Sequence, residues 1–309
     1  MSTIPGTGSD TLAGIHPILY AFFNADGTLD RGAMRRQVDA LIAMGAHGIA
    51  VLGLATEVRS LTPAERRMLM DWTAEDVGGR VPLAVTIFEP TAEAQIAAAR
   101  HARSVGADWL ILQPPPGGGT PEDDLVNFFS TVGSAVDLPF AIQNAPEYLG
   151  VGLTAPGLRT LASRCPRFRL LKGEASAVAI AALIRETGGR LTVFNGRGGL
   201  EIVDNLAAGC AGIIPAPDVA DRLIGIHAAF AAGDEHGARE RYAEILPVIV
   251  FVMQSIDSLL IYGKLLAARR LGLRPPVQRN PVQRNPALKP TAFGLTCLDR
   301  WTSQLGRFE

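Results

Sequence analysis

The sequence is poor in cysteine, in aromatic residues and in net charge. Its three cysteines, Cys165, Cys210 and Cys297, are widely spaced, and an odd number at such spacing argues against a disulfide framework or a CxxC metal site. The formal net charge is -1, and acidic and basic residues are interleaved. There is no basic stripe of the kind that nucleic-acid or anionic-membrane binding requires. We therefore expect a small-molecule partner, with no nucleic acid and no membrane.

Segments that would mark a membrane span, a leader or a metal site are also missing. No apolar run reaches spanning length. The N-terminus, Met1 to Leu12, is polar and lacks a basic region followed by an apolar stretch, so we expect no signal peptide and a cytoplasmic location. His16 and His47 have no carboxylate or second histidine at metal-ligand spacing. We expect no metal and no cofactor.

The sequence does contain a regular alternation of strand and helix patterns. Apolar segments of strand length recur at intervals of roughly 25 to 30 residues, each followed by a helical pattern. No antiparallel hairpin signal separates them, which leaves a barrel or a doubly wound sheet, and eight units favour a (β/α)8 TIM barrel. The predicted strands are 16–23, 48–53, 82–88, 109–114, 139–144, 168–174, 191–196 and 212–216.

Helix start signals support this alternation, and the pattern changes after the eighth strand. Thr62 and Thr120 are each followed by proline and acidic residues, which is the chemistry of a capped helix start. We predict a barrel over residues 1–232 and a C-terminal helical extension over 233–309. The extension contains three predicted helices, 235–252, 255–271 and 291–306, and a tandem VQRNPVQRNP segment, 277–286, interpreted as a surface connector.

Lysine is rare, which makes one lysine conspicuous. Lys172, Lys264 and Lys289 are the lysines among 29 basic residues. Lys172 ends an apolar strand, where burial would favour the neutral amine that a nucleophile needs. Strand alternation places Glu174 on the same face, so both side chains should enter the barrel mouth, where barrel enzymes carry their chemistry. The alternative is a strand-end ion pair. Lys264 is expected to snorkel to the surface.

Several short motifs are similar to those of the dihydrodipicolinate synthase and N-acetylneuraminate lyase family. They are GLATE at 53–57, QNAP at 143–146, Lys172, the Asn195-Gly196 pair and the helical extension. The resemblance implies a barrel enzyme that holds a 2-oxo acid as a Schiff base on Lys172. It also implies a homo-oligomer, either a tetramer or a dimer.

The departures from the family pattern narrow the resemblance. Leu54 and Ala55 occupy the positions of two threonines, and a hydroxyl follows one place later at Thr56. Gln143 stands where the family has a proton-relaying tyrosine, and prolines follow strand four where the synthases have another tyrosine. Glutamine cannot titrate. The QNAP motif, the spacing of Lys172 and Glu174, and the hydroxyl residue just before Glu57 are together similar to the 2-keto-3-deoxyarabonate dehydratases of the family.

The predicted site follows from this resemblance. Lys172 would form the Schiff base, and Glu174 would remove the C3 proton and return one to the departing C4 hydroxyl of a 2-keto-3-deoxy sugar acid. Thr56 and nearby backbone N–H groups would bind the C1 carboxylate. The other predicted substrate-binding residues are Ala55, Glu57, Gln143, Asn144 and Asn195, although Asn195 could equally satisfy backbone groups in its own turn.

Other functions stay open at this point. Retro-aldol cleavage to pyruvate would need Tyr148, Tyr20 or water in place of the missing tyrosine, and a synthase-like condensation lacks its relay. The glycine-rich loop at 196–199 could bind a phosphorylated ligand without Schiff-base chemistry. A non-enzymatic, ligand-sensing barrel is a further alternative. Product analysis and borohydride trapping separate these interpretations.

Overall fold

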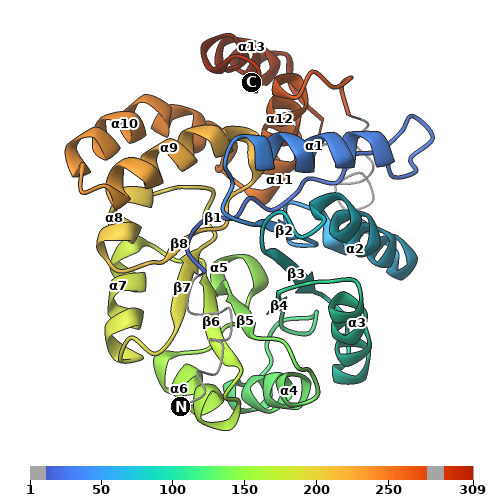
Figure 1. Ribbon diagram of the computed structural model, residues 1–309, viewed down its shortest axis with the longest axis vertical. Helices are drawn as coiled ribbons and strands as arrows, with labels where there is room; N and C mark the ends of the chain where they lie inside the picture. Colours follow the sequence, from blue (N-terminus) through green and yellow to red (C-terminus); the bar gives the residue numbers. More distant parts are fainter. Residues whose placement is uncertain (1–11, 277–288, 309) are drawn as a thin grey trace, which may run out of the picture.

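The protein is built around a closed ring of eight parallel strands (Figure 1). The computed structural model describes residues 12–276 and 289–308. The strands are β1 (Gly14–Ile15), β2 (Ile49–Val51), β3 (Leu83–Ile87), β4 (Trp109–Leu112), β5 (Phe140–Asn144), β6 (Phe168–Gly173), β7 (Thr192–Asn195) and β8 (Gly212–Ile213). They are hydrogen-bonded in the order β1-β8-β7-β6-β5-β4-β3-β2. Ile18 closes the ring through a parallel bridge to Ala50.

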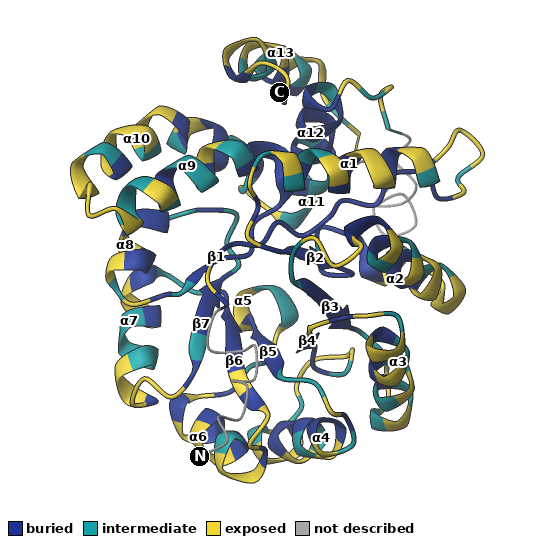
Figure 2. Ribbon diagram, viewed as in Figure 1, coloured by how far each residue is buried: buried dark blue, intermediate teal, exposed yellow. Residues whose placement is uncertain are grey.

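Helices cover the outside of the ring, which confirms the predicted (β/α)8 barrel. The strands are buried almost throughout, whereas the helices are exposed on their outer faces (Figure 2). Flat apolar strands bury both faces only when helices cover the outer one. These helices are α1 (Arg31–Ala43), α2 (Pro63–Val77), α3 (Ala92–Ser104), α4 (Glu122–Ser134), α6 (Ala155–Arg164), α7 (Ala177–Glu186), α8 (Ile202–Ala207) and α9 (Ala220–Ala231).

The two predicted helix starts differ in outcome. Thr62 caps α2 in a full capping box, accepting from the backbone N–H of Glu65 while the Glu65 carboxylate accepts from the N–H of Thr62. Helix α4 instead begins at Glu122 with Pro121 at its cap and no side-chain cap bond. The prediction that Thr120 caps this helix is therefore wrong. Acidic residues fill its first turn, where they favour the helix dipole.

Prolines shorten the first and last strands relative to the prediction. The predicted strand 16–23 contains Pro17, which has no N–H to donate to a ladder, and regular strand β1 ends at Ile15. Pro215 acts similarly after β8. The chain nevertheless stays in the ring, because the Ile18 N–H donates to the Pro215 carbonyl at 2.8 Å.

A helical extension follows the barrel, as predicted. It consists of α10 (Glu235–Val252), then α11 (Ile256–Ser258), a π-helix η3 (Leu259–Gly263) and α12 (Lys264–Arg270) in direct succession, and finally α13 (Ala292–Leu305). Helix α10 packs along α9, and α12 and α13 lie beyond α1 at one end of the molecule (Figure 1). The domain division at residues 232 and 233 stays a prediction, and the tandem segment 277–286 lies outside the described residues.

The described residues contain neither a single membrane-spanning helix nor a single group of side chains that could hold a metal ion. Among these residues, no single helix has both the length and the hydropathy of a membrane span. Helix α10 and residues 256–270 reach them only when taken together, and the two are bent by 102° relative to each other. Within residues 12–276 and 289–308, no group of three or more histidine, cysteine, aspartate or glutamate side chains is arranged to hold a metal ion.

Candidate active site

A lysine and a glutamate meet at the C-terminal end of β6. Lys172 Nζ lies 2.9 Å from Glu174 Oε1, and their side chains are only 4% and 3% exposed. Lys172 is in register with Gln143 of β5 and Phe194 of β7. The predicted meeting of the two side chains in the barrel mouth is therefore present in the structure. A proton can pass between an amine and a carboxylate at this separation.

Two glutamines hold the Glu174 carboxylate in place. The Gln143 side-chain N–H donates to Glu174 Oε1 at 2.7 Å, while the Gln143 Oε1 accepts from the Gln113 amide at 2.6 Å. Gln113, immediately after β4, thus fixes the direction of the Gln143 amide. All three side chains are buried. Sequence reasoning missed Gln113, and its only signal was a polar residue after the apolar run WLIL.

The residue that follows β7 must be small for this pair to fit. A Cβ atom built on Gly196 would lie 2.6 Å from Glu174 Oε1 and 2.7 Å from Lys172 Cε. Real carbon atoms do not approach so closely. The glycine of the Asn195-Gly196 motif therefore makes room for the lysine–glutamate pair.

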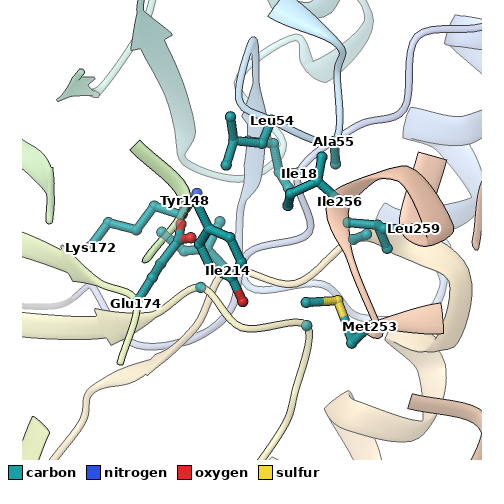
Figure 3. Close-up of a pocket in the computed structure, with 13 residues that line it drawn as sticks. Ile18, Leu54, Ala55, Tyr148, Lys172, Glu174, Ile214, Met253, Ile256 and Leu259 are labelled. Atoms are coloured by element: carbon teal, nitrogen blue, oxygen red, sulfur yellow. Dashed lines mark ion pairs between the residues drawn. The ribbon is translucent and has the colours of Figure 1, made fainter. Parts of the chain in front are cut away.

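The pair opens onto a small cavity at the barrel mouth (Figure 3). Lys172, Glu174 and Tyr148 lie on one side, and Met253, Ile256 and Leu259 of the extension lie opposite. Tyr148 comes from α5 (Pro146–Leu149), a short helix after β5. The cavity holds about 20 Å³, which is room for about one water molecule. The remaining lining residues are Ile18, Leu54, Ala55, Gly196, Gly198, Ile214 and Ala216.

Thr56 does not present its hydroxyl to this cavity. The hydroxyl donates to the Leu19 carbonyl at 2.6 Å and accepts from the Leu52 N–H at 3.0 Å. Leu52 has a left-handed φ of 68°, which is costly for leucine and needs such support. The hydroxyl thus stabilises the turn after β2, and this arrangement contradicts its predicted role in binding the carboxylate. Of the predicted residues in this turn, Ala55 alone lines the cavity.

The two predicted asparagines also support backbone rather than the cavity. The Asn144 side chain donates to the Leu153 carbonyl at 2.9 Å and accepts from its N–H at 2.7 Å. The Asn195 side chain donates to the Ala175 carbonyl and accepts from the Arg197 N–H. Both side chains are occupied in holding loops. For Asn195 this is the alternative that the sequence left open, and for Asn144 the predicted substrate contact is wrong in this arrangement.

Glu57 and Lys264 form a second buried ion pair. The Lys264 Nζ donates to Glu57 Oε1 at 2.5 Å, and the two side chains are 0% and 1% exposed. The ammonium also lies 4.8 Å from the centre of the Phe23 ring, a favourable cation–π arrangement. The prediction that Lys264 snorkels is therefore wrong. Burial lowers the pKa of Lys264, and the Glu57 carboxylate acts in the opposite direction.

Of the two tyrosines near the barrel mouth, one has its hydroxyl bound to another side chain and the other lines the cavity. Tyr20 is fully buried and donates its hydroxyl to Asp218 at 2.8 Å. Burial, together with the neighbouring Asp218 charge, raises the pKa of Tyr20 well above its usual value, and Tyr20 does not line the cavity. Tyr148 is half-buried in the cavity wall, and its hydroxyl has no hydrogen-bond partner within the described part of the chain.

The chain is similar to known proteins along most of its length. Residues 11–288 match the Dihydrodipicolinate synthetase family. The chain belongs to that family. It is 30% identical to the L-2-keto-3-deoxyarabonate dehydratase of Azospirillum brasilense over 242 residues, which cover 76% of this chain and 78% of the relative.

Two further comparisons concern a second relative and the fold. The chain is also 31% identical to the probable 2-dehydro-3-deoxy-D-pentonate aldolase YjhH of Escherichia coli. This match extends over 150 residues, which are 48% of this chain and 50% of the relative. The crystal structure of a putative dihydrodipicolinate synthetase from Pseudomonas aeruginosa superposes with a TM-score of 0.88 at 25% identity. That superposition covers 96% of this chain and all of the other.

Proposed function

We propose that the protein is a Schiff-base lyase that dehydrates a 2-keto-3-deoxy sugar acid. The observation that carries the proposal is the buried Lys172–Glu174 pair in the cavity wall, with a glutamine rather than a tyrosine bonded to the carboxylate. A dehydratase needs an amine, and a carboxylate that can both accept and donate a proton. The likeness to L-2-keto-3-deoxyarabonate dehydratase supports the same reaction.

In the first step Lys172 becomes covalently bound to the substrate. Glu174 takes a proton from the Lys172 ammonium, and the neutral amine attacks the C2 carbonyl of the 2-oxo acid. The Glu174 carboxyl group returns its proton to the carbinolamine hydroxyl, which leaves as water, so that an iminium ion and a Glu174 carboxylate result. The positive nitrogen withdraws electrons and makes the C3 hydrogen acidic.

In the second step water is eliminated between C3 and C4. The Glu174 carboxylate removes the C3 proton, and the C3–H electron pair forms an enamine. The enamine expels the C4 hydroxyl, which leaves as water after taking a proton from the Glu174 carboxyl group. For a substrate with a C5 hydroxyl, loss of a C5 proton and protonation of C3 give an enol, which tautomerises to the C5 aldehyde. Water then hydrolyses the iminium, which restores the Lys172 amine and releases the dehydrated 2-oxo semialdehyde.

The substrate carboxylate would be held by the turn after β2. The backbone N–H groups of Ala55 and Thr56 have no hydrogen-bond partner among the described residues, and Ala55 lines the cavity beside the reactive pair. Two successive backbone N–H groups without protein partners suit a carboxylate. The Thr56 hydroxyl contributes indirectly, by stabilising the turn that presents these groups.

A pyruvate-releasing aldolase is the second candidate, because a phenol is present in the cavity. Retro-aldol cleavage must remove a proton from the substrate alcohol, and Tyr148 lines the cavity with a hydroxyl free of protein hydrogen bonds within the described chain. Tyr20 is unsuitable because its hydroxyl is bound to Asp218 outside the cavity. The partial likeness to YjhH also favours this candidate.

Product analysis with a panel of 2-keto-3-deoxy sugar acids tests the proposal. A dehydrated 2-oxo semialdehyde formed without pyruvate is the expected product, and Lys172→Ala is the control that should form none. If one pyruvate is released for each substrate molecule consumed, the enzyme is an aldolase and the proposed dehydration is wrong. Light scattering measures whether the enzyme forms the dimer or tetramer that we expect.

A further inference from the structure

The Glu57–Lys264 ion pair joins two parts of the active-site wall. Glu57 follows the turn that carries Leu54 and Ala55 into the cavity. Lys264 begins α12 directly after the π-helix that carries Leu259 into the same cavity. The 2.5 Å contact therefore connects the turn after β2 to the extension that covers the mouth. Neither charged side chain reaches the cavity itself.

The surroundings of this pair are tightly packed. A Cβ atom on Gly263 would lie 2.4 Å from the Tyr20 hydroxyl, so the π-helix is pressed against Tyr20. Tyr20 donates to Asp218, and the Arg270 guanidinium donates to the Asp218 carbonyl at 2.9 Å. These contacts are separate from the ion pair, and together with it they attach η3 and α12 to the loops after β1, β2 and β8. A π-helix within an α-helix frequently marks a functional site.

We infer that the Glu57–Lys264 pair positions the carboxylate-binding turn and the Leu259 cover relative to Lys172, and so sets the affinity for the bound 2-oxo acid. Glu57 and Lys264 are positioning residues, since neither touches the substrate. This inference rests on the proposed Schiff-base function. The physical reason is that the turn has two left-handed residues, Leu52 and Glu57, and a charged anchor at Glu57 holds that strained conformation.

Titration of wild-type protein and variants with pyruvate and borohydride tests the inference. The fraction of Lys172 trapped is plotted against pyruvate concentration, which gives a half-saturation concentration. The fraction trapped at saturating pyruvate shows separately whether Lys172 can still form the Schiff base. Glu57→Gln is expected to raise the half-saturation concentration by about tenfold or more while a Lys172 adduct still forms at saturation. Because one unpaired buried charge can prevent folding, the double variant Glu57→Gln/Lys264→Met is measured as well.

The matched control is another ion pair on the same helix, between a buried arginine and a partly exposed aspartate. Arg270 of α12 contacts Asp221 of α9 at 2.7 Å, and neither residue lines the cavity. Asp221→Asn should lower the unfolding temperature but leave the half-saturation concentration within about twofold of wild type, since it does not hold the turn. Circular dichroism confirms the fold of each variant.

The outcomes separate this inference from the proposed function. If wild-type Lys172 is not trapped at any pyruvate concentration, the proposed function fails. If wild type is trapped and the folded double variant shows the same half-saturation concentration, the positioning role is wrong. An equal shift in Asp221→Asn would also overturn it, because the effect would then reflect general loosening of the extension.

Discussion

The molecule contains two buried lysine–glutamate pairs that look alike in composition and burial. Lys172 and Glu174 are two residues apart at one strand end, with their charged atoms separated by 2.9 Å. Lys264 and Glu57 are 207 residues apart in sequence and 2.5 Å apart in space. All four side chains are at most 4% exposed. The first pair lines the cavity, and the second does not.

The difference between them lies in their neighbours rather than in their charges. Glu174 accepts from a neutral amide, and both members of its pair line the cavity. Lys264 is instead fully buried, with its ammonium over the Phe23 ring, and it does not line the cavity. A buried amine is therefore a candidate nucleophile only where a carbonyl compound can reach it. Burial and pairing alone indicate a structural ion pair equally well.

The largest expected effect is on activity, and it separates Lys172 from Lys289. Lys172→Met should abolish turnover, because no other amine lines the cavity of the described chain. Lys289→Met, at an exposed position, should leave turnover unchanged. The release of 2-oxo semialdehyde is measured for each variant. Measurable turnover by a folded Lys172→Met enzyme would show that Lys172 is not the nucleophile, so that neither lysine–glutamate pair could be called the reactive one.

The two glutamates provide the next comparison. Glu174→Gln should lower kcat by about 10² to 10⁴-fold, because the amide can neither accept the C3 proton nor donate one to the leaving hydroxyl. Borohydride trapping with pyruvate should persist at elevated pH, where solvent can deprotonate the amine. Glu57→Gln should instead act mainly on KM. A kcat for Glu174→Gln within threefold of wild type would exclude the carboxylate as the acid and base.

The Glu57–Lys264 pair should matter most for the free energy of unfolding. Lys264→Met leaves the Glu57 carboxylate buried without a partner, and such a loss costs about 3–5 kcal/mol. The double variant Glu57→Gln/Lys264→Met should recover most of that cost, since no charge is left unpaired. Urea unfolding followed by circular dichroism measures both values. Equal stability of Lys264→Met and wild type would contradict an anchoring role for this ion pair.

The smallest expected effect concerns the phenol in the cavity. Tyr148→Phe should change the rate of dehydration by less than about tenfold, because the proposed mechanism moves its protons through Glu174. The measurement is kcat for semialdehyde release. If kcat of Tyr148→Phe falls by more than about a hundredfold and wild type releases pyruvate, Tyr148 is the general base and the enzyme is an aldolase.

Much of the fold and the reactive pair could be predicted because both depend on local pattern. The eight apolar segments and their helices carry the barrel, and the two-residue offset between Lys172 and Glu174 places them together on one face of β6. The strand ends were less accurate where prolines interrupt the ladder. The lysine therefore needed no tertiary information to be found.

The remainder of the site depends on contacts between distant segments. The Thr56 hydroxyl bonds to Leu19, 37 residues away, so its position in a substrate-binding motif did not reveal its structural use. The Glu57–Lys264 pair spans 207 residues, and no periodicity connects them. Gln113 matters through its bond to Gln143. A single sequence does not show which polar side chains are already satisfied by another loop.

Peptide mapping after borohydride reduction tests the central claim most directly. Wild-type protein is incubated with pyruvate, reduced and digested, and the modified lysine is identified by mass spectrometry. The account predicts one adduct, on Lys172, with Lys264 and Lys289 unmodified. Absence of any adduct under conditions that support turnover, or an adduct on Lys264 in place of Lys172, would contradict it.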